Sequence, residues 1–350
     1  MSRAFTDHRG CADGPYAGHG RRGAGGAHGK AILLGEHAVV YGTPALVIPV
    51  PQLTVTANAT RCPCSGEGGD RISFATTGPQ TASVTPLMSD SMQHLVAEFR
   101  KRTDVVEPMC VDVLIDCLIP QARGLGSSAA CARAAVLALA DVFDRRLDAG
   151  TVFELVQASE TVVHGRASGI DALATGATSP LFFRSGTARA LPIAMAGDGP
   201  GEPGGFSGLF VVADSGVDGS TKEAVELLRR TFERDAQAKA AFVRRVSNLT
   251  YAALHDLEQG RLSDFGARLT ENHGLLRDVG ISTDRIDALV EAALAAGGFG
   301  AKISGGGLGG CMVALAGDLR QAEAVVRGLE QAGAVQTWVV PVGRFAGHAD

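Results

Sequence analysis

Long apolar segments and a surplus of either charge are both missing from this sequence. No stretch of the 350 residues reaches the roughly 20 apolar residues of a membrane-spanning helix, and the N-terminus lacks the apolar run of a signal peptide. The 32 Lys and Arg stand against 37 Asp and Glu, giving a formal net charge of -5 with no basic stripe. These absences argue against a membrane protein and a nucleic-acid-binding protein, and a reducing cytoplasm is the expected location.

Cysteine is scattered rather than patterned. Of the seven cysteines, only Cys62 and Cys64 lie close together in the sequence, which fits neither a disulfide framework nor a zinc site. We therefore expect ordinary buried or surface thiols.

The composition predicts a folded protein of one large or two ordinary domains. Apolar residues make up 45% of the chain, which is enough for a substantial core. Part of the excess of glycine (46 residues) lies in residues 1–28, which lack apolar periodicity and are expected to be a disordered leader. A Gly- and Pro-rich break at residues 197–208 suggests one domain over residues 29–200 and a second over residues 207–350.

Predicted strands and helices interleave along the chain, which favours an α/β or α+β fold. Apolar runs predict strands over residues 31–34, 45–50, 111–119, 209–213 and 311–315. Helices are predicted over residues 89–100, 127–143, 151–164, 222–260 and 284–296, the third beginning at a Thr151/Glu154 capping box.

The glycines at residues 124–126 form a candidate phosphate loop between a predicted strand and a predicted helix. Gly124 and Gly126 let the backbone approach a ligand closely, and the positive end of the helix dipole favours phosphate. A hydroxyl such as that of Ser128 can bind Mg²⁺ that bridges phosphates. The plain alternative is a tight turn in which Ser127 or Ser128 caps the helix.

Two other types of nucleotide-binding loop agree less well with the sequence. Gly124-x-Gly126-x-x-Ala129 also matches the dinucleotide fingerprint, but residues 120–123 separate strand from glycine and no second strand ending in an acidic residue follows. The same pattern at residues 305–310 precedes a strand-like run and is taken as accidental. A Walker loop ending at Lys30 fails because Ala24 occupies the position of its first glycine.

Three segments together resemble the GHMP kinases, the family of galacto-, homoserine, mevalonate and phosphomevalonate kinases. Residues 29–42 (GKAILLGEHAVVYG) resemble the first motif, residues 120–130 (PQARGLGSSAA) the phosphate loop and residues 302–311 (KISGGGLGGC) the third motif. Their order and spacing also fit. Two positions depart from the pattern, because His28 stands where proline is usual and Ala122 where the loop has its first glycine.

The resemblance implies an α+β protein with the GHMP kinase fold, combining an N-terminal ribosomal-protein-like α/β domain with a C-terminal ferredoxin-like α+β domain. It also implies ATP and Mg²⁺ as cofactors. The loop residues expected to bind ATP are Gly124, Leu125, Gly126, Ser127, Ser128 and Ala129.

Within the family, residues 160–171 (ETVVHGRASGID) resemble a segment of the mevalonate kinases. The resemblance implies that Glu160 and Ser128 bind Mg²⁺ and that Asp171 is the catalytic base, with Lys30 beside it and the reacting phosphate. Glu36, His37, Lys30 and Asp171 are expected at the substrate. The implied reaction phosphorylates the 5-hydroxyl of mevalonate, a small molecule. Such enzymes are often dimers, so the resemblance also suggests a homodimer.

The chemistry is coherent on the residues alone. A hydroxyl is a poor nucleophile at neutral pH, and a carboxylate that accepts its proton typically contributes about 10²–10⁴-fold. Lys30 could hold Asp171 ionised, while loop amides and Mg²⁺ neutralise phosphate charge. Taken singly, Asp171 could be a turn residue and Glu160 a solvated helix position. Thr221, in a Gly-Ser-Thr segment, is a loose match to a residue that touches the substrate or Asp171.

Three rival functions stay open. The first is another GHMP kinase, acting on phosphomevalonate or a sugar. The second is a non-catalytic ligand sensor with the same fold, and the third is a nicotinamide-dependent oxidoreductase.

Overall fold

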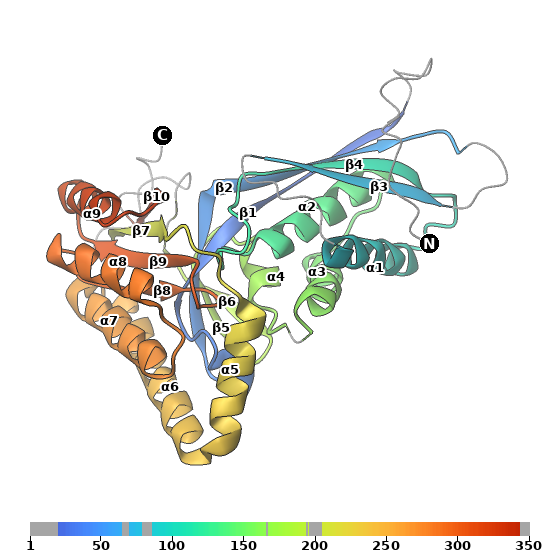
Figure 1. The fold of residues 1–350 in the computed structure, drawn as a ribbon. Helices are drawn as coiled ribbons and strands as arrows, with labels where there is room; N and C mark the ends of the chain where they lie inside the picture. Colours follow the sequence, from blue (N-terminus) through green and yellow to red (C-terminus); the bar gives the residue numbers. More distant parts are fainter. Residues whose placement is uncertain are drawn as a thin grey trace. The chain divides into compact units, whose positions relative to one another are not determined.

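The computed structural model describes residues 20–64, 70–78, 86–165, 167–193, 195 and 205–343. Helices and strands interleave along the chain, as the sequence predicted (Figure 1). The strands are β1 (Arg22–Leu34), β2 (Ala45–Arg61), β3 (Arg71–Thr77), β4 (Cys110–Cys117), β5 (Leu181–Arg184), β6 (Thr187–Ala190), β7 (Gly208–Asp214), β8 (Gly300–Ser304), β9 (Cys311–Ala316) and β10 (Gln336–Val342). The α-helices are α1 (Pro86–Thr103), α2 (Ser127–Val142), α3 (Ala149–His164), α4 (Ile170–Ala174), α5 (Thr221–Arg234), α6 (Ala236–Glu258), α7 (Leu262–Asp278), α8 (Asp284–Ala295) and α9 (Leu319–Gln331), and Val39–Tyr41 form a short 3-10 helix. Within the ranges described, no helix combines the length and apolarity needed to cross a membrane.

The chain divides into two compact units, and each is described by itself. The first comprises residues 1–27, 55–118 and 128–165, and the second residues 28–54, 119–127 and 166–350. The chain passes from the second unit into the first within β2. The domain boundary expected after residue 200 lies on residues 196–204, outside the described residues, so it stays a prediction.

Helices α1, α2 and α3 cover one face of the sheet in the first unit (Figure 1). The second half of β2 pairs antiparallel with β4, from Val55 opposite Cys117 to Arg61 opposite Val111, and β3 pairs parallel with β4. Side chains alternate along β2, so Ala57 is buried whereas its neighbour Thr56 is exposed. This alternation leaves one face of the sheet for the helices and one for solvent.

The expectation of a disordered leader is wrong for residues 22–28, which form the first half of β1. Gly23 and Gly25 lie directly against α2, where an added Cβ would overlap the backbone at Val142 and Ala134. Glycine is therefore needed here to bring the strand close to the helix, which is a packing role that composition alone does not reveal. Residues 1–19 of the expected leader lie outside the described residues.

The start of α3 also differs from the prediction. Asp148 is the N-cap, and its carboxylate accepts a hydrogen bond from Thr151 N at 2.7 Å, so the helix begins at Ala149. Glu154, expected to complete a capping box, instead pairs with Arg102. An acidic residue three positions upstream has displaced the threonine as the cap.

A disulfide joins Cys64 to Cys110, which corrects the expectation of ordinary thiols at these two positions. The two cysteines are 46 residues apart in sequence but their Cα atoms are 5.6 Å apart. They are close because β2 pairs with β4, and this pairing continues beyond the end of β2, where Cys62 N donates to Cys110 O at 2.8 Å. Sequence spacing could not show this proximity because it depends on strand register.

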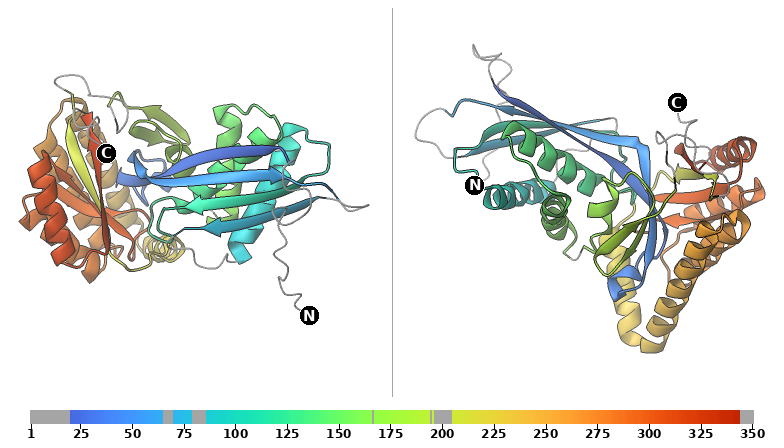
Figure 2. Two further views of the ribbon diagram at one scale, coloured as in Figure 1. Left: turned by 90° about the horizontal axis from the view of Figure 1, so that it is seen from above. Right: turned by 180° about the vertical axis from the view of Figure 1, so that it is seen from behind.

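The second unit contains a four-stranded antiparallel sheet in the order β10-β7-β9-β8. Helices α7, α8 and α9 pack on this sheet (Figure 2). The single helical region expected over residues 222–260 is two helices, because Asp235 ends α5 and its carboxylate caps α6 by accepting from Ala238 N at 2.8 Å. The mixed architecture agrees with the predicted α+β class.

A separate core in the second unit supports the region around Asp171. The first half of β2 pairs with β5, from Ala45 opposite Phe183 to Val47 opposite Leu181. Ile32 of β1 and two residues of α4, Ile170 and Ala174, are buried in the same apolar cluster as this strand pair. The cluster fixes α4 against β1, and so fixes the residue that follows Ile170.

Candidate active site

Lys30 and Asp171 form an ion pair in the second unit. Lys30 Nζ lies 2.9 Å from Asp171 Oδ1 and also donates to the carbonyl of Gly124 at 2.9 Å. The Lys30 side chain is 2% exposed and that of Asp171 is 30% exposed. A buried cation is thus held against a carboxylate that remains open on another side, which is an arrangement suited to accepting a proton.

The glycine loop is fixed to β1 beside this pair. Lys30 N donates to Leu125 O at 3.0 Å. Gly124 and Gly126 both have positive φ, 73° and 78°, and an added Cβ at Gly126 would lie 3.1 Å from Lys30 Cγ. The chain then enters α2 at Ser127 without an intervening residue. Glycine-dependent backbone leading straight into a helix N-terminus is a cradle that favours phosphate.

Ala122 occupies a backbone conformation that favours glycine. Its φ is 55°, and its carbonyl accepts a hydrogen bond from Gly219 N at 2.8 Å. A residue with a Cβ costs roughly 1–2 kcal/mol in the left-handed region. The position where this chain departs from the GHMP kinase pattern is therefore strained, and contacts from elsewhere in the unit must hold it.

Glu36 pairs with Lys302 in the interior of the second unit. Lys302 is fully buried and Glu36 is 3% exposed. Burial lowers the pKa of Lys302, an effect that the charge of Glu36 and its hydrogen bond oppose. The other carboxylate oxygen, Glu36 Oε2, is buried and has no hydrogen-bond partner among the described residues. An unsatisfied buried acceptor costs about 1–3 kcal/mol, which a bound hydroxyl would relieve.

His37 lies in the same region and is held as a neutral ring. Burial lowers its pKa from 6.5 to about 4, against the opposing effect of a hydrogen bond to the Gly306 backbone and with a further lowering by Lys302. Its Nε2 is buried without a hydrogen-bond partner within the described ranges. The neutral ring therefore presents a lone pair on Nε2, because the nitrogen bonded to the Gly306 carbonyl must carry the proton.

The third glycine segment is joined to β1 and to the phosphate loop. The Ser304 hydroxyl donates to Ile32 O at 3.0 Å, and Ile32 N lies 2.9 Å from the same hydroxyl oxygen. Gly305 and Gly124 are in van der Waals contact, since an added Cβ at Gly305 would lie 2.7 Å from Gly124 Cα. Thr221, singled out in the sequence, lies against Gly306. Most of the three sequence motifs (residues 29–42, 120–127 and 302–311) thus lies within the second unit, whereas residues 128–130 belong to the first.

Ser128 and Glu160, expected to bind Mg²⁺, belong to the first unit. Ser128 is in the first turn of α2 and is partly exposed, whereas Glu160 is buried near the end of α3. Glu160 Oε2 is 3.6 Å from His164 Nε2, one turn later. In the part of the chain that the structure describes, no group of three His, Cys, Asp or Glu residues is arranged to hold a metal.

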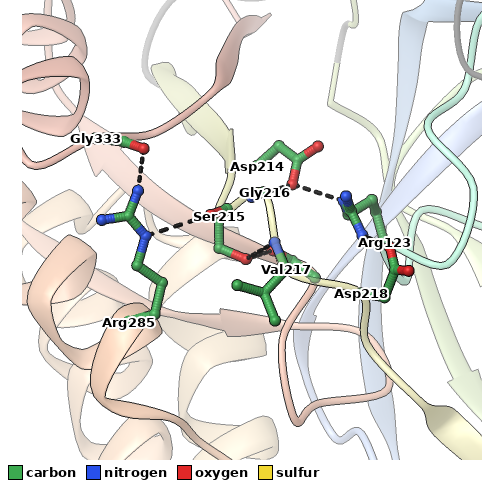
Figure 3. Close-up of polar contacts among 9 residues, drawn as sticks. Arg123, Asp214, Ser215, Gly216, Val217, Asp218, Arg285 and Gly333 are labelled. Atoms are coloured by element: carbon green, nitrogen blue, oxygen red, sulfur yellow. Dashed lines mark hydrogen bonds and ion pairs between the residues drawn. The ribbon is translucent and has the colours of Figure 1, made fainter.

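Sequence reasoning missed four charged residues near the motifs. Arg123, which follows the strained Ala122, pairs with Asp214 and Asp218 (Figure 3). Lys302 was read only as part of a motif and proves to be the partner of Glu36. Each of these residues is a charged residue close to a glycine segment, which could have marked it as a candidate. Its ion-pair partner is distant in sequence, however, and could not be identified from the sequence.

Comparison with known families finds two matches. Residues 91–177 match the GHMP kinases N terminal domain, and residues 253–335 match the GHMP kinases C terminal family. The two matches lie in the same order as the motifs along the chain.

Curated relatives similar to this chain include archaeal mevalonate kinases. One from Pyrococcus abyssi is 32% identical over 311 residues, covering 83% of this chain and 87% of the relative. One from Aeropyrum pernix is 29% identical over 308 residues, covering 87% of this chain and 90% of the relative.

Solved structures show the same fold. That of L. major mevalonate kinase in complex with R-mevalonate matches with a TM-score of 0.75 at 23% identity, covering 92% of this chain and 96% of that one. Mevalonate kinase from methicillin-resistant Staphylococcus aureus matches with a TM-score of 0.65 at 28% identity, covering 91% and 98%. The predicted GHMP kinase fold is confirmed.

Proposed function

Since this chain belongs to the mevalonate kinase family within the GHMP kinases, we propose that it transfers the γ-phosphate of ATP to the 5-hydroxyl of mevalonate, giving 5-phosphomevalonate. Relatives of that name at 32% identity over 83% of the chain support the substrate. The observation in the chain that supports the reaction most is the ion pair between Lys30 and Asp171 beside the glycine loop. It combines a proton acceptor with a phosphate cradle.

Asp171 acts as the general base. Its carboxylate is partly open while its Oδ1 is held 2.9 Å from Lys30 Nζ, so one oxygen is oriented and the other is available to the substrate hydroxyl. Accepting the hydroxyl proton as the oxygen attacks phosphorus typically contributes about 10²–10⁴-fold. The apolar cluster that buries Ile170 keeps this carboxylate in position.

Lys30 acts on the transferred phosphoryl group. An ammonium has three N–H donors, and two are used by Asp171 and the Gly124 carbonyl. The third is available to an equatorial phosphate oxygen, where charge is spread in the transition state. The phosphates themselves are bound by the backbone of residues 124–129, for which the glycine cradle and the start of α2 are suited.

Glu36 and His37 bind the acceptor substrate. Glu36 Oε2 and His37 Nε2 are buried acceptors without protein partners in the described ranges, and a polyhydroxy acid offers the hydroxyl donors that they lack. A substrate that lacks these hydroxyls would leave both protein acceptors unpaired at a cost in free energy, so the two acceptors favour substrates that carry hydroxyls at matching positions.

Ser128 and Glu160 are the residues that would hold Mg²⁺. The Ser128 hydroxyl and the Glu160 carboxylate are hard oxygen ligands of the type that Mg²⁺ prefers, and Mg²⁺ commonly uses only one or two protein ligands together with phosphates. When bound, the ion neutralises phosphate charge. Ser128 and Glu160 then serve to hold the ion, while the proton transfer belongs to Asp171.

The test is ADP release by purified protein with Mg-ATP and each of four acceptors: mevalonate, phosphomevalonate, galactose and homoserine. We expect release with mevalonate only. Release with a different acceptor alone would overturn the substrate while leaving the kinase chemistry in place. Binding of ATP without release on any acceptor would favour a ligand sensor instead.

A further inference from the structure

Arg123 lies in the phosphate loop but its guanidinium is bound to protein carboxylates. Arg123 Nε lies 2.8 Å from Asp214 Oδ1, and Nη1 pairs with Asp218 Oδ1 (Figure 3). Asp214 is fully buried whereas Asp218 is 82% exposed. Burial alone would lower the pKa of Arg123, but the hydrogen bonds and charges of Asp218 and Asp214 outweigh it and raise the pKa. The charge of the arginine is thus balanced by carboxylates of the protein itself.

The segment that binds Arg123 is itself hydrogen-bonded to its neighbours in the second unit. Asp214 ends β7, pairs in register with Cys311 of β9, and accepts from Gly216 N at 2.8 Å. Ser215 donates from both its backbone N and its hydroxyl to Gly310 O, at 3.0 and 2.6 Å. On its other side, Arg285 donates to Ser215 O at 3.3 Å and also to Gly333 O (Figure 3). Asp214 is therefore a fixed anchor in the four-stranded sheet.

The same anchor region holds the strained residue that precedes Arg123. Gly219 N donates to Ala122 O at 2.8 Å, just beyond the two acids in sequence. On the opposite side, an added Cβ at Gly310 would lie 2.8 Å from Arg123 O, so the loop backbone is packed against the third glycine segment. One short stretch of chain, residues 214–219, thus contacts both Ala122 and Arg123.

We propose that Arg123 is a positioning residue: through Asp214 and Asp218 it clamps the phosphate loop to the second unit's sheet and compensates for the strain that Ala122 introduces. The proposal rests on the kinase function above. It assigns Arg123 no contact with phosphate, because its guanidinium is paired with the two carboxylates: Nη1 donates a hydrogen bond to Asp218, and Nε lies beside Asp214 as an ion pair without a hydrogen bond among the described residues. The loop amides of Gly124 and Gly126 then meet the phosphates in a conformation already set before ATP binds.

The test is calorimetric binding of MgADP to the full chain, together with kcat and KM for each substrate. Arg123→Ala should weaken MgADP binding and raise KM for ATP by about 10- to 100-fold, with KM for the acceptor within about threefold. Asp218→Asn should weaken binding in the same direction, by a smaller factor. Arg229→Ala, on an exposed face of α5, is the matched control and should change neither constant.

Relief of strain provides the sharpest readout. Ala122→Gly alone should change MgADP affinity by less than about threefold, but in the Arg123→Ala background it should restore about 5- to 30-fold, the factor that corresponds to the strain at Ala122. An effect confined to thermal stability would not show this rescue. If Arg123→Ala fails to fold, Arg123→Lys replaces it, because lysine keeps the charge but cannot bridge both carboxylates.

Three outcomes would overturn the proposal. Tighter MgADP binding in Asp218→Asn would mean that Arg123, once released, binds phosphate itself. Affinity in Arg123→Ala within twofold of wild type would mean that the loop does not depend on the clamp. Weakened binding without rescue by Ala122→Gly would mean that Arg123 does not compensate for strain at Ala122. MgADP binding needs no acceptor, so failure of the clamp is distinguishable from a wrong substrate.

Discussion

Replacing Lys302 with methionine tests how much the buried ion pair between Lys302 and Glu36 stabilises the second unit. Lys302 is fully buried, and its removal leaves the carboxylate of Glu36 at 3% exposure without its cation. Breaking a buried pair by removing one partner costs about 3–5 kcal/mol, because the remaining charge is uncompensated. Lys302→Met should therefore lower the free energy of unfolding by about 3–5 kcal/mol. The double variant Glu36→Gln/Lys302→Met removes both charges and should lose less than about 2 kcal/mol.

Urea titration followed by tryptophan fluorescence measures this directly. The chain has one tryptophan, Trp338 in β10, and β10 belongs to the same four-stranded sheet as β8, which carries Lys302. The signal thus reports on the unit in which the change is made. Lys222→Met, at an exposed position of α5, is the control and should stay within about 0.5 kcal/mol. A loss below about 1 kcal/mol in Lys302→Met, or a double variant no more stable than the single one, would refute the reasoning.

Three further changes have defined outcomes. Asp171→Asn should lower kcat by about 10²–10⁴-fold in the ADP-release assay with little change in KM for ATP, and a variant that keeps a tenth of wild-type kcat would remove Asp171 from the role of base. Burial lowers the pKa of His37 from 6.5 to about 4, so the folded state keeps the ring neutral where the unfolded chain would protonate it. The contribution of His37 to the free energy of unfolding is therefore complete above about pH 7, and about 3 kcal/mol is lost as the pH drops from 6.5 to 4. His37→Asn, which tolerates the positive φ, should flatten that dependence in urea titrations, and an unchanged slope would contradict the assignment. Cys64→Ser opens a loop closed over 46 residues and should lower the unfolding free energy of the first unit by about 4 kcal/mol; a loss under about 1 kcal/mol would show that the disulfide does not stabilise it.

The motifs could be recognised in the sequence, but the contacts that hold them in position could not be predicted from it. Lys30 and Asp171 could be named because both lie in segments that resemble the kinase family, and the structure brings their side chains to 2.9 Å. Arg123 could not be interpreted in the same way, because its partner Asp218 is 95 positions away and an arginine beside a glycine loop is equally typical of a phosphate ligand. Local patterns locate reactive groups, whereas the contacts that hold them depend on the register and packing of distant strands.

The wrong expectations share a physical cause. Gly23 and Gly25 were counted as signs of disorder, yet both are required where β1 packs on α2. Thr151 matched a capping pattern, yet Asp148 offered a better acceptor to the same helix end. In each case a tertiary or competing local contact decided the outcome. A homodimer and a cytoplasmic location stay predictions from the sequence.

The contact between Gly124 and Gly305 changes how a loss-of-activity variant should be understood. An added Cβ at Gly305 would lie 2.7 Å from Gly124 Cα, and one at Gly124 would lie 3.0 Å from Gly305 Cα, so neither position can gain a side chain while the other backbone stays in place. A Gly305→Ala variant would then fail as a kinase although residue 305 need never touch a nucleotide. A mutational scan that assigns both glycines to ATP binding would therefore count a single steric constraint between the two loops as two separate ligand contacts.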